Sequence, residues 1–341
     1  MKIRKNEWRG VGLSSEVLDG APPPSTAVGA PELLLRQCPA AAETPLTVID
    51  AFGTSIWIKD ERSRMGLGSF KALGAAYVIA HDAAQGGAEN SSTALAGRTY
   101  VTASAGNHGL SVAVGAKIFG AKAVIYLAET VPEAFVEKLR SKDASVIREG
   151  ADYEQSMEAA KKAAKDNGWS LLSDSSWPGY FETPHRLMEG YLVMAAEITR
   201  QISAPPTHIF LQAGVGGLAS ACAAWFRKVW GAAPQIIVVE PVNAPALYES
   251  IAVGRPVETA GPVSCMGRLD CKEPSLIALN GLSRDADLFA LVSDCEAEAV
   301  LPTLSEAGLA CTTSAAAGVA ALSLMDLPLG SRPLCILSET V

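Results

Sequence analysis

The sequence of 341 residues is 49% hydrophobic and 19% charged, and its formal net charge is −8. A chain of this length can bury a large core, and the composition is that of a globular protein, which excludes a disordered or fibrous chain. The acidic balance argues against nucleic acid or an anionic membrane surface as a partner.

Strand and helix patterns alternate along most of the chain. Residues 1–45 are rich in proline and alanine and are predicted to form an irregular arm. A strand at 56–59 leads to an apolar helix at 72–83, and a polar loop at 86–97 is expected to cross into a second lobe. Further strands are expected at 100–103, 123–127, 146–147, 170–173, 209–212, 236–240, 288–292 and 334–337, and further helices at 110–119, 132–142, 152–167, 187–202, 217–229, 294–307 and 314–325.

Alternation at this spacing predicts parallel sheets with helices on both faces. We therefore expect an α/β fold of two interleaved, doubly wound lobes with mostly parallel sheets and a cleft between them. The larger lobe is assigned residues 1–83 and 193–341, and the smaller lobe residues 84–192.

Cysteine and histidine usage indicates neither a disulfide framework nor a metal site. The seven cysteines are scattered and form no C-x-x-C pair, and the four histidines are equally dispersed. Reduced thiols in the cytoplasm are expected. The basic start of the chain has no apolar stretch behind it, which argues against a signal peptide.

Three short stretches stand out from this background. Lys71, in Ser-Phe-Lys-Ala-Leu-Gly, begins an apolar helix, where a lysine would otherwise be structural or snorkelling. The loop at 104–109, Ser-Ala-Gly-Asn-His-Gly, lies between a strand and a helix. So does the loop at 214–218, Gly-Val-Gly-Gly-Leu, whose amides and helix dipole would suit a phosphate. Each loop alone is also consistent with an ordinary turn.

Together with Leu-Ser-Glu-Thr at 337–340, and in this order, these stretches resemble the second fold type of pyridoxal-phosphate (PLP) enzymes. That family includes threonine and serine dehydratases, serine racemase, cysteine synthase and the diaminopropionate ammonia-lyases. The resemblance implies PLP as the cofactor, bound in the cleft between the lobes. Homodimers are the habit of the family.

The resemblance also implies a role for each stretch. Lys71 would form the Schiff base and later remove the Cα proton, and burial is expected to lower its pKa. Asn107 would face the cofactor O3′, and Ser338 the pyridine nitrogen, although the sequence around Ser338 departs from the family forms. The cofactor phosphate would be held by Gly214, Val215, Gly216, Gly217 and Leu218, and the substrate carboxylate by Ser104, Ala105, Gly106, Asn107 and His108. A purely structural role for His108 is the alternative.

Several further stretches, among them Asp-Ser-Ser-Trp-Pro-Gly-Tyr at 174–180, are similar to the diaminopropionate ammonia-lyases. This similarity implies β-elimination of ammonia from 2,3-diaminopropionate, which gives pyruvate. A β-amine must leave protonated, and Asp174 is the candidate carboxylate for that proton, a structural role being the alternative. Ala105 stands where enzymes that accept the D-isomer carry an aspartate, so preference for the L-isomer is predicted.

Two other functions stay open. The loop at 104–109 also matches the dehydratases, which would remove water from L-serine, L-threonine or a 3-hydroxyaspartate. The chain could also bind PLP or an amino acid without catalysis.

Overall fold

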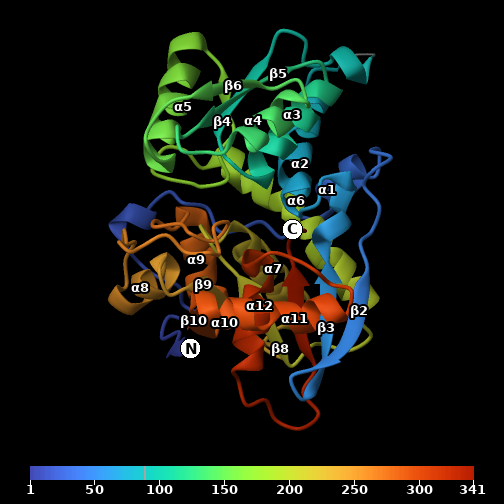
Figure 1. Ribbon diagram of the computed structural model, residues 1–341, viewed down its shortest axis with the longest axis vertical. Helices are drawn as coiled ribbons and strands as arrows, with labels where there is room; N and C mark the ends of the chain where they lie inside the picture. Colours follow the sequence, from blue (N-terminus) through green and yellow to red (C-terminus); the bar gives the residue numbers. More distant parts are fainter. Residues whose placement is uncertain (88–89) are drawn as a thin grey trace.

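The computed structural model describes residues 1–87 and 90–341 and contains two β-sheets, each flanked by helices (Figure 1). The larger sheet has seven strands in the order β1-β10-β9-β8-β11-β3-β2, and the smaller has four in the order β6-β5-β4-β7. The strands of the larger sheet are β1 (Lys2–Lys5), β2 (Leu46–Ala51), β3 (Thr54–Asp60), β8 (His208–Gln212), β9 (Gln235–Pro241), β10 (Leu288–Val292) and β11 (Pro333–Leu337). Those of the smaller are β4 (Thr99–Ala103), β5 (Lys122–Leu127), β6 (Ser145–Arg148) and β7 (Ser170–Leu171).

Strand direction brings the expected site segments to one edge of the larger sheet. β11 lies between β8 and β3 and is parallel to both, with Leu334 opposite Ile209 and Trp57. The antiparallel strands β1 and β2 form the two outer edges. Because the carboxyl ends of parallel strands meet at one edge, the chain segments that follow β3, β8 and β11 begin near one another.

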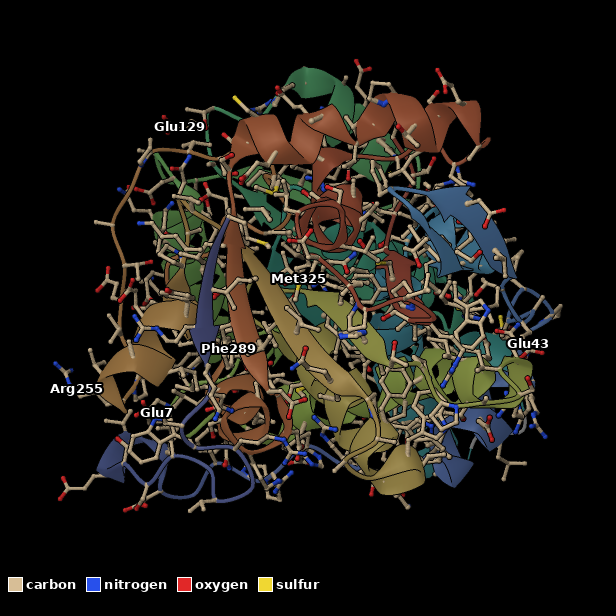
Figure 2. The ribbon with its side chains drawn as sticks, turned by 90° about the horizontal axis from the view of Figure 1, so that it is seen from below. Glu7, Glu43, Glu129, Arg255, Phe289 and Met325 are labelled. Atoms are coloured by element: carbon tan, nitrogen blue, oxygen red, sulfur yellow. The ribbon has the colours of Figure 1, made fainter. Side chains whose placement is uncertain are left out.

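Helices cover both faces of the larger sheet. Along β8, Ile209 and Leu211 belong to one buried cluster and Phe210 to another, as the two-residue repeat of a strand requires. Phe289 on β10 lies inside the molecule, whereas the labelled Arg255 lies at its rim (Figure 2). The α-helices are α1 (Gly29–Leu35), α2 (Lys71–Gln85), α3 (Asn107–Ile118), α4 (Glu133–Arg140), α5 (Tyr153–Asn167), α6 (Glu182–Gln201), α7 (Gly217–Trp230), α8 (Ala246–Val253), α9 (Leu276–Asp285), α10 (Asp294–Ala299), α11 (Leu301–Glu306) and α12 (Thr313–Ser323). Three short 3-10 helices are η1 (Glu16–Leu18), η2 (Glu61–Gly66) and η3 (Ser91–Thr93).

The structure confirms the mixed α/β fold with mostly parallel sheets and corrects the N-terminal arm. Residues 1–45 were expected to be irregular, but β1 pairs with β10 and α1 is helical. β2, α8 and α9 were not foreseen.

The lobe boundaries stay a prediction, and the one at 192/193 falls inside the continuous helix α6. Within the predicted loop at 86–97, residues 88–89 lie outside the described part. None of the helices in the described ranges is long and apolar enough to cross a membrane.

Two glycines let helices α2 and α6 cross closely. A Cβ atom on Gly190 would lie 2.5 Å from the carbonyl oxygen of Leu73, and one on Gly74 would lie 2.8 Å from Cε1 of Tyr191. Contacts this short leave no room for a side chain at either position. The crossing therefore fixes the position of the helix that begins at Lys71.

A buried cluster of charges fixes the segment that leads into the same helix. Lys59 Nζ and Arg64 Nη2 lie 2.7 and 2.6 Å from Glu197 Oε2, and Arg64 Nε lies 2.7 Å from Glu61 Oε2. The side chains involved are at most 4% exposed. Thr44 donates a 2.5 Å hydrogen bond to Glu61. The cluster ties β3 and η2 to α6.

The helix crossing predicts that Gly190→Ala destabilises the protein by about 2 kcal/mol or more, because the added methyl would press on the α2 backbone. The free energy of unfolding in urea measures the change. Gly29→Ala is the matched control, since nothing lies within 4 Å of its added Cβ, and it should stay within about 0.5 kcal/mol of the wild type. Equal effects of the two substitutions would contradict a tight crossing.

The buried cluster predicts a pH-dependent cost of Glu197→Gln. Burial would raise the pKa of Glu197, but Arg64 and Lys59 outweigh burial and lower that pKa. Burial lowers the pKa of Lys59 although Glu197 and Glu61 lie beside it, whereas the same carboxylates raise the pKa of Arg64. Arg64 is therefore the stronger charged partner of Glu197. Because the folded-state pKa of Glu197 is depressed, its stabilising contribution is present above the unfolded pKa of about 4.3 and is lost as pH falls through the folded pKa.

Glu197→Gln should therefore lower the free energy of unfolding at pH 7 by about 3 kcal/mol or more. The gap to the wild type should narrow as the pH falls below about 4.3. Urea unfolding of both proteins across the acid range measures this gap. A gap that stays constant with pH would show that Glu197 is not the ionised partner.

Candidate active site

The segments that follow β3 and β11 lie against each other at the carboxyl edge of the larger sheet. The amide of Phe70 donates a 3.1 Å hydrogen bond to the carbonyl of Ser338, and the amide of Thr340 donates one of 2.9 Å to Gly68. These bonds hold the residues just before Lys71 beside the last residues of the chain. Lys71 is the first residue of α2.

Lys71 forms an ion pair with Asp174, which lies in the loop between β7 and α6. The two side chains are 23% and 18% exposed, so the pair is largely shielded from water. Burial would lower the pKa of Lys71, but the Asp174 carboxylate outweighs burial and raises that pKa. The same pairing holds the pKa of Asp174 well below its usual range, although burial alone would raise it. The expectation of a lowered Lys71 pKa is therefore wrong for this structure, because it counted burial and not the partner.

Two residues that had been given no role lie around this pair. The ring of Tyr191 packs against Phe70 at 4.9 Å, and its buried hydroxyl has no hydrogen-bond partner among the described residues. Burial raises the pKa of Tyr191, and the charges of Lys71 and Asp174 also act on it. Burial raises the pKa of Cys271 to about 12, with a further contribution from Asp174. Both residues lie in stretches, 188–191 and 266–274, that are also similar to the diaminopropionate ammonia-lyases, and this similarity was the signal that could have singled them out.

The glycine loop at 214–218 joins β8 to α7 and lies next to Asp174. A Cβ on Gly217 would be 3.9 Å from the carbonyl oxygen of Asp174 and 3.7 Å from Tyr191. Gly216 has a φ of +96°, a conformation that favours glycine. The amides of Gly217 and Leu218 have no acceptor within the described part of the chain.

These free amides at the start of a 14-residue helix fit a phosphate. The loop also has no space for larger residues, since a Cβ on Gly214 would lie 2.9 Å from Cys271 Sγ. The structure is therefore compatible with the predicted phosphate contacts of Gly214, Val215, Gly216, Gly217 and Leu218, and these individual roles stay predictions.

The loop between β4 and α3 contacts the end of the chain. Asn107 donates a 2.5 Å hydrogen bond from its amide to Glu339, and Thr312 donates one of 2.6 Å to the other carboxylate oxygen. Arg268 Nε lies 3.6 Å from Glu339. Glu339 is 4% exposed, and burial raises its pKa. Sequence reasoning gave Glu339 and Arg268 no role, although both lie in stretches with a family resemblance, because their contacts are with residues far away in the chain.

His108 and Ser338 are both buried near this loop. The ring nitrogen Nε2 of His108 lies 2.8 Å from the carbonyl oxygen of Leu172, and burial lowers the pKa of the ring. This contact favours the structural alternative for His108. The hydroxyl of Ser338 makes no hydrogen bond to the described residues, so its contact with a pyridine nitrogen stays a prediction.

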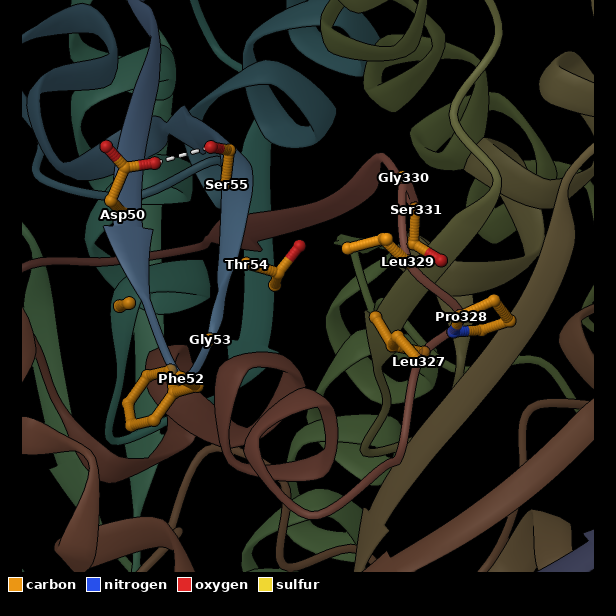
Figure 3. A pocket seen from close by; sticks show the side chains of 11 residues that line it. Asp50, Phe52, Gly53, Thr54, Ser55, Leu327, Pro328, Leu329, Gly330 and Ser331 are labelled. Carbon is orange, nitrogen blue, oxygen red and sulfur yellow. Dashed lines mark hydrogen bonds between the residues drawn. The ribbon is translucent and has the colours of Figure 1, made fainter.

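A surface hollow lies at the opposite end of the larger sheet. It is lined by the β2–β3 hairpin, residues 50–55, and by the loop at 327–331 (Figure 3). These residues lie at or before the start of β3 and β11, whereas Lys71 and Ser338 follow the two strands, so the hollow is distant from the Lys71 site. Nowhere in residues 1–87 and 90–341 do three His, Cys, Asp or Glu side chains form a group that could hold a metal ion.

The chain is similar to known ammonia-lyases in sequence. A family model described as pyridoxal-phosphate dependent enzyme matches residues 38–339. Diaminopropionate ammonia-lyase of Salmonella typhimurium is 35% identical over 71% of this chain and 65% of its own length. The Escherichia coli enzyme of the same name is 32% identical over 74% of this chain and 68% of its own. The matched region thus spans about two thirds of these relatives.

The fold leads to the same relatives. Escherichia coli diaminopropionate ammonia-lyase in complex with an aminoacrylate-PLP azomethine intermediate matches with a TM-score of 0.87 at 27% identity, covering 99% of this chain and 93% of that one. Threonine deaminase isoform 2 from Solanum lycopersicum, at 20% identity and a TM-score of 0.79 over 100% and 95% of the two chains, shares the fold. The chain therefore belongs to the family of pyridoxal-phosphate dependent enzymes and has the architecture of their second fold type.

Proposed function

We propose that the protein is a PLP-dependent ammonia-lyase that converts L-2,3-diaminopropionate and water to pyruvate and two molecules of ammonia. The observation that carries this proposal is the ion pair between Lys71 and Asp174 beside the glycine loop. A carboxylate at the reactive lysine suits a leaving group that must depart as an amine carrying an added proton. The diaminopropionate ammonia-lyases similar to this chain support the choice of substrate.

Each residue of the site has a task that its surroundings allow. The amides at the start of α7 would hold the cofactor phosphate, and Lys71 would anchor its ring. When bound, PLP supplies an electron sink that makes the Cα proton of an amino acid removable. Lys71 is the base placed to take that proton once its amine is free and neutral.

Asp174 serves the other half of the elimination. The Cβ–N bond can break only if the β-amine carries an additional proton, because an amide ion is too poor a leaving group. Asp174 would hold the β-nitrogen as an ammonium group, which leaves as ammonia; where the β-nitrogen is a neutral amine, Asp174 would pass to it the proton that Lys71 removed from Cα. The hydroxyl of Tyr191 has no hydrogen-bond partner among the described residues, and the charges of Lys71 and Asp174 act on it.

Ala105 supports the preference for the L-isomer. Abstraction of the Cα proton from a D-amino acid would need a base on the face opposite Lys71, and the alanine side chain offers none. Lys71 is then the base available at Cα.

The location and assembly of the protein belong to the same proposal. Seven free cysteines suit a reducing compartment such as the cytoplasm. A homodimer follows the habit of the family, and size-exclusion chromatography with light scattering tests it.

The function predicts a product ratio. With L-2,3-diaminopropionate as substrate, the pure holoenzyme should release two molecules of ammonia for each pyruvate, and the D-isomer should react at least about tenfold more slowly. Quantifying the keto acid and ammonia for both isomers and for L-serine and L-threonine tests the proposal. Turnover of only the hydroxyamino acids, with a ratio of one, would indicate a dehydratase, and cofactor binding without any keto acid a catalytically silent protein.

The role of Asp174 predicts a loss that depends on the leaving group. Asp174→Asn should lower kcat for diaminopropionate about a hundredfold or more, because the β-amine loses its proton source. β-Chloro-L-alanine, whose chloride leaves without a proton, should lose less than about tenfold. Asp166→Asn, an exposed aspartate on α5, is the control and should match the wild type. Equal losses for both substrates would mean that Asp174 only shapes the site.

A further inference from the structure

The hydroxyl of Tyr191 is a buried polar group without a partner. Tyr191 is 1% exposed, and its hydroxyl makes no hydrogen bond within residues 1–87 and 90–341. A buried polar group without a partner costs free energy, and native proteins leave few of them. An unpaired hydroxyl of this kind, placed at a candidate active site, indicates a ligand that completes its hydrogen bonds.

The ring of Tyr191 directs this hydroxyl toward Lys71. Its Cε1 and Cε2 atoms face Gly74 on α2 and Gly217 on α7, at 2.8 and 3.7 Å from the place of an added Cβ. The hydroxyl lies between these two ring carbons, so it enters the space between the starts of the two helices. Burial raises the pKa of Tyr191, and Lys71 and Asp174 act on that pKa in opposite directions. Both charges therefore lie within reach of the hydroxyl.

The same space already holds an ammonium group, that of Lys71. Its Nζ pairs with the carboxylate of Asp174 and lies 5.4 Å from the centre of the Phe70 ring. The Phe70 ring in turn packs against Tyr191, with the ring centres 4.9 Å apart. A carboxylate, an aromatic ring and a hydroxyl oxygen are all groups that attract a cation. Asp174, Phe70 and Tyr191 thus form an ammonium site, which the side chain of Lys71 occupies in this structure.

We propose that the ammonium site binds the β-ammonium group of the substrate, and that Tyr191 and Phe70 thereby select a β-amine over an uncharged β-substituent. The Lys71 ammonium stands in for that of the substrate. Once the Lys71 amine is linked to the cofactor, Asp174 and Tyr191 can accept hydrogen bonds from a second ammonium group. An ammonium offers several donors, whereas a β-hydroxyl offers one and a β-chloride none. The inference rests on the proposed function in that the substrate carries a β-amine.

Two amino acids of nearly equal size test the role of Tyr191 in binding. L-2,3-Diaminopropionate and L-2-aminobutyrate differ in one group on Cβ, an ammonium or a methyl. Both are titrated against Lys71→Ala protein supplied with PLP, which lacks the base at Cα, and binding is followed by the visible absorption of the cofactor. Adding Tyr191→Phe should raise the Kd for diaminopropionate about tenfold or more, because a hydrogen bond to a charged group is lost. The Kd for L-2-aminobutyrate should change less than about threefold.

The holoenzyme with Lys71 in place gives a second measurement. Tyr191→Phe should lower kcat/KM for diaminopropionate about tenfold or more, but that for β-chloro-L-alanine less than about threefold. Phe70→Leu should have the same selectivity with a smaller loss, about two- to fivefold, because a cation–π contact is weaker than a charged hydrogen bond. Because Tyr191→Phe keeps the ring and removes an unpaired hydroxyl, its thermal midpoint should not fall below that of the wild type.

Tyr126→Phe is the matched control, because Tyr126 on β5 belongs to a separate buried cluster with Met157 of α5. It should leave both Kd values unchanged. An unchanged Kd for diaminopropionate in Tyr191→Phe, or equal losses for diaminopropionate and L-2-aminobutyrate, would overturn the proposal. Binding to the Lys71→Ala protein requires no elimination, so the inference can fail while the ammonia-lyase function stands. Absence of pyruvate from the wild type would refute that function without changing the two Kd values.

Discussion

The site depends on one ion pair, that of Lys71 with Asp174, formed where little water reaches either group. Removing one partner from such a pair leaves the other buried and uncompensated, which costs more than an exposed pair would. The pair also affects the protonation of Lys71 and of Asp174. Asp174 raises the pKa of Lys71 and Lys71 lowers that of Asp174, so the pairing favours one ammonium and one carboxylate. The neutral amine needed for a Schiff base requires the proton to move within this site.

The rest of the structure holds Lys71 and Asp174 beside each other. Lys71 is fixed by the α2–α6 crossing at Gly74 and Gly190, and the segment before it by the charge cluster around Glu197. The helix crossing and the charge cluster both join α6 to the segment around Lys71. A change in the packing of α6 would therefore move the lysine relative to Asp174, which lies just before α6 in the chain.

Local signals made part of this structure predictable from the sequence. Asp152 caps α5 by accepting a hydrogen bond from the amide of Gln155, and Gly168 ends the helix with a φ of +66°; both residue types are common at these helix ends. The strands β8 to β11 were predicted because each is a largely apolar run of strand length. The short polar strand β1 was missed because its identity depends on pairing with β10, which lies far away in the sequence.

At the site, too, local sequence patterns could not predict contacts between residues that lie far apart in the chain. The sequence located Lys71 and Asp174 separately, but the direction of the Lys71 pKa depends on a contact between residues 103 positions apart. The contacts of Glu339 and Arg268 could not be predicted for the same reason, because they join residues far apart in the sequence. Glu339 lies in the stretch at 337–340 and Arg268 in that at 266–274, but neither stretch shows that both side chains contact the loop at 104–107.

The residue at position 105 bears on the proposed stereochemical preference and also contacts Arg268. Arg268 lies over the backbone of Ala105, within hydrogen-bonding distance of its carbonyl oxygen. A carboxylate side chain at this position would offer the guanidinium a charged partner. With alanine there, the side chain at position 105 offers no base. The proposed preference for the L-isomer therefore depends on this one small side chain.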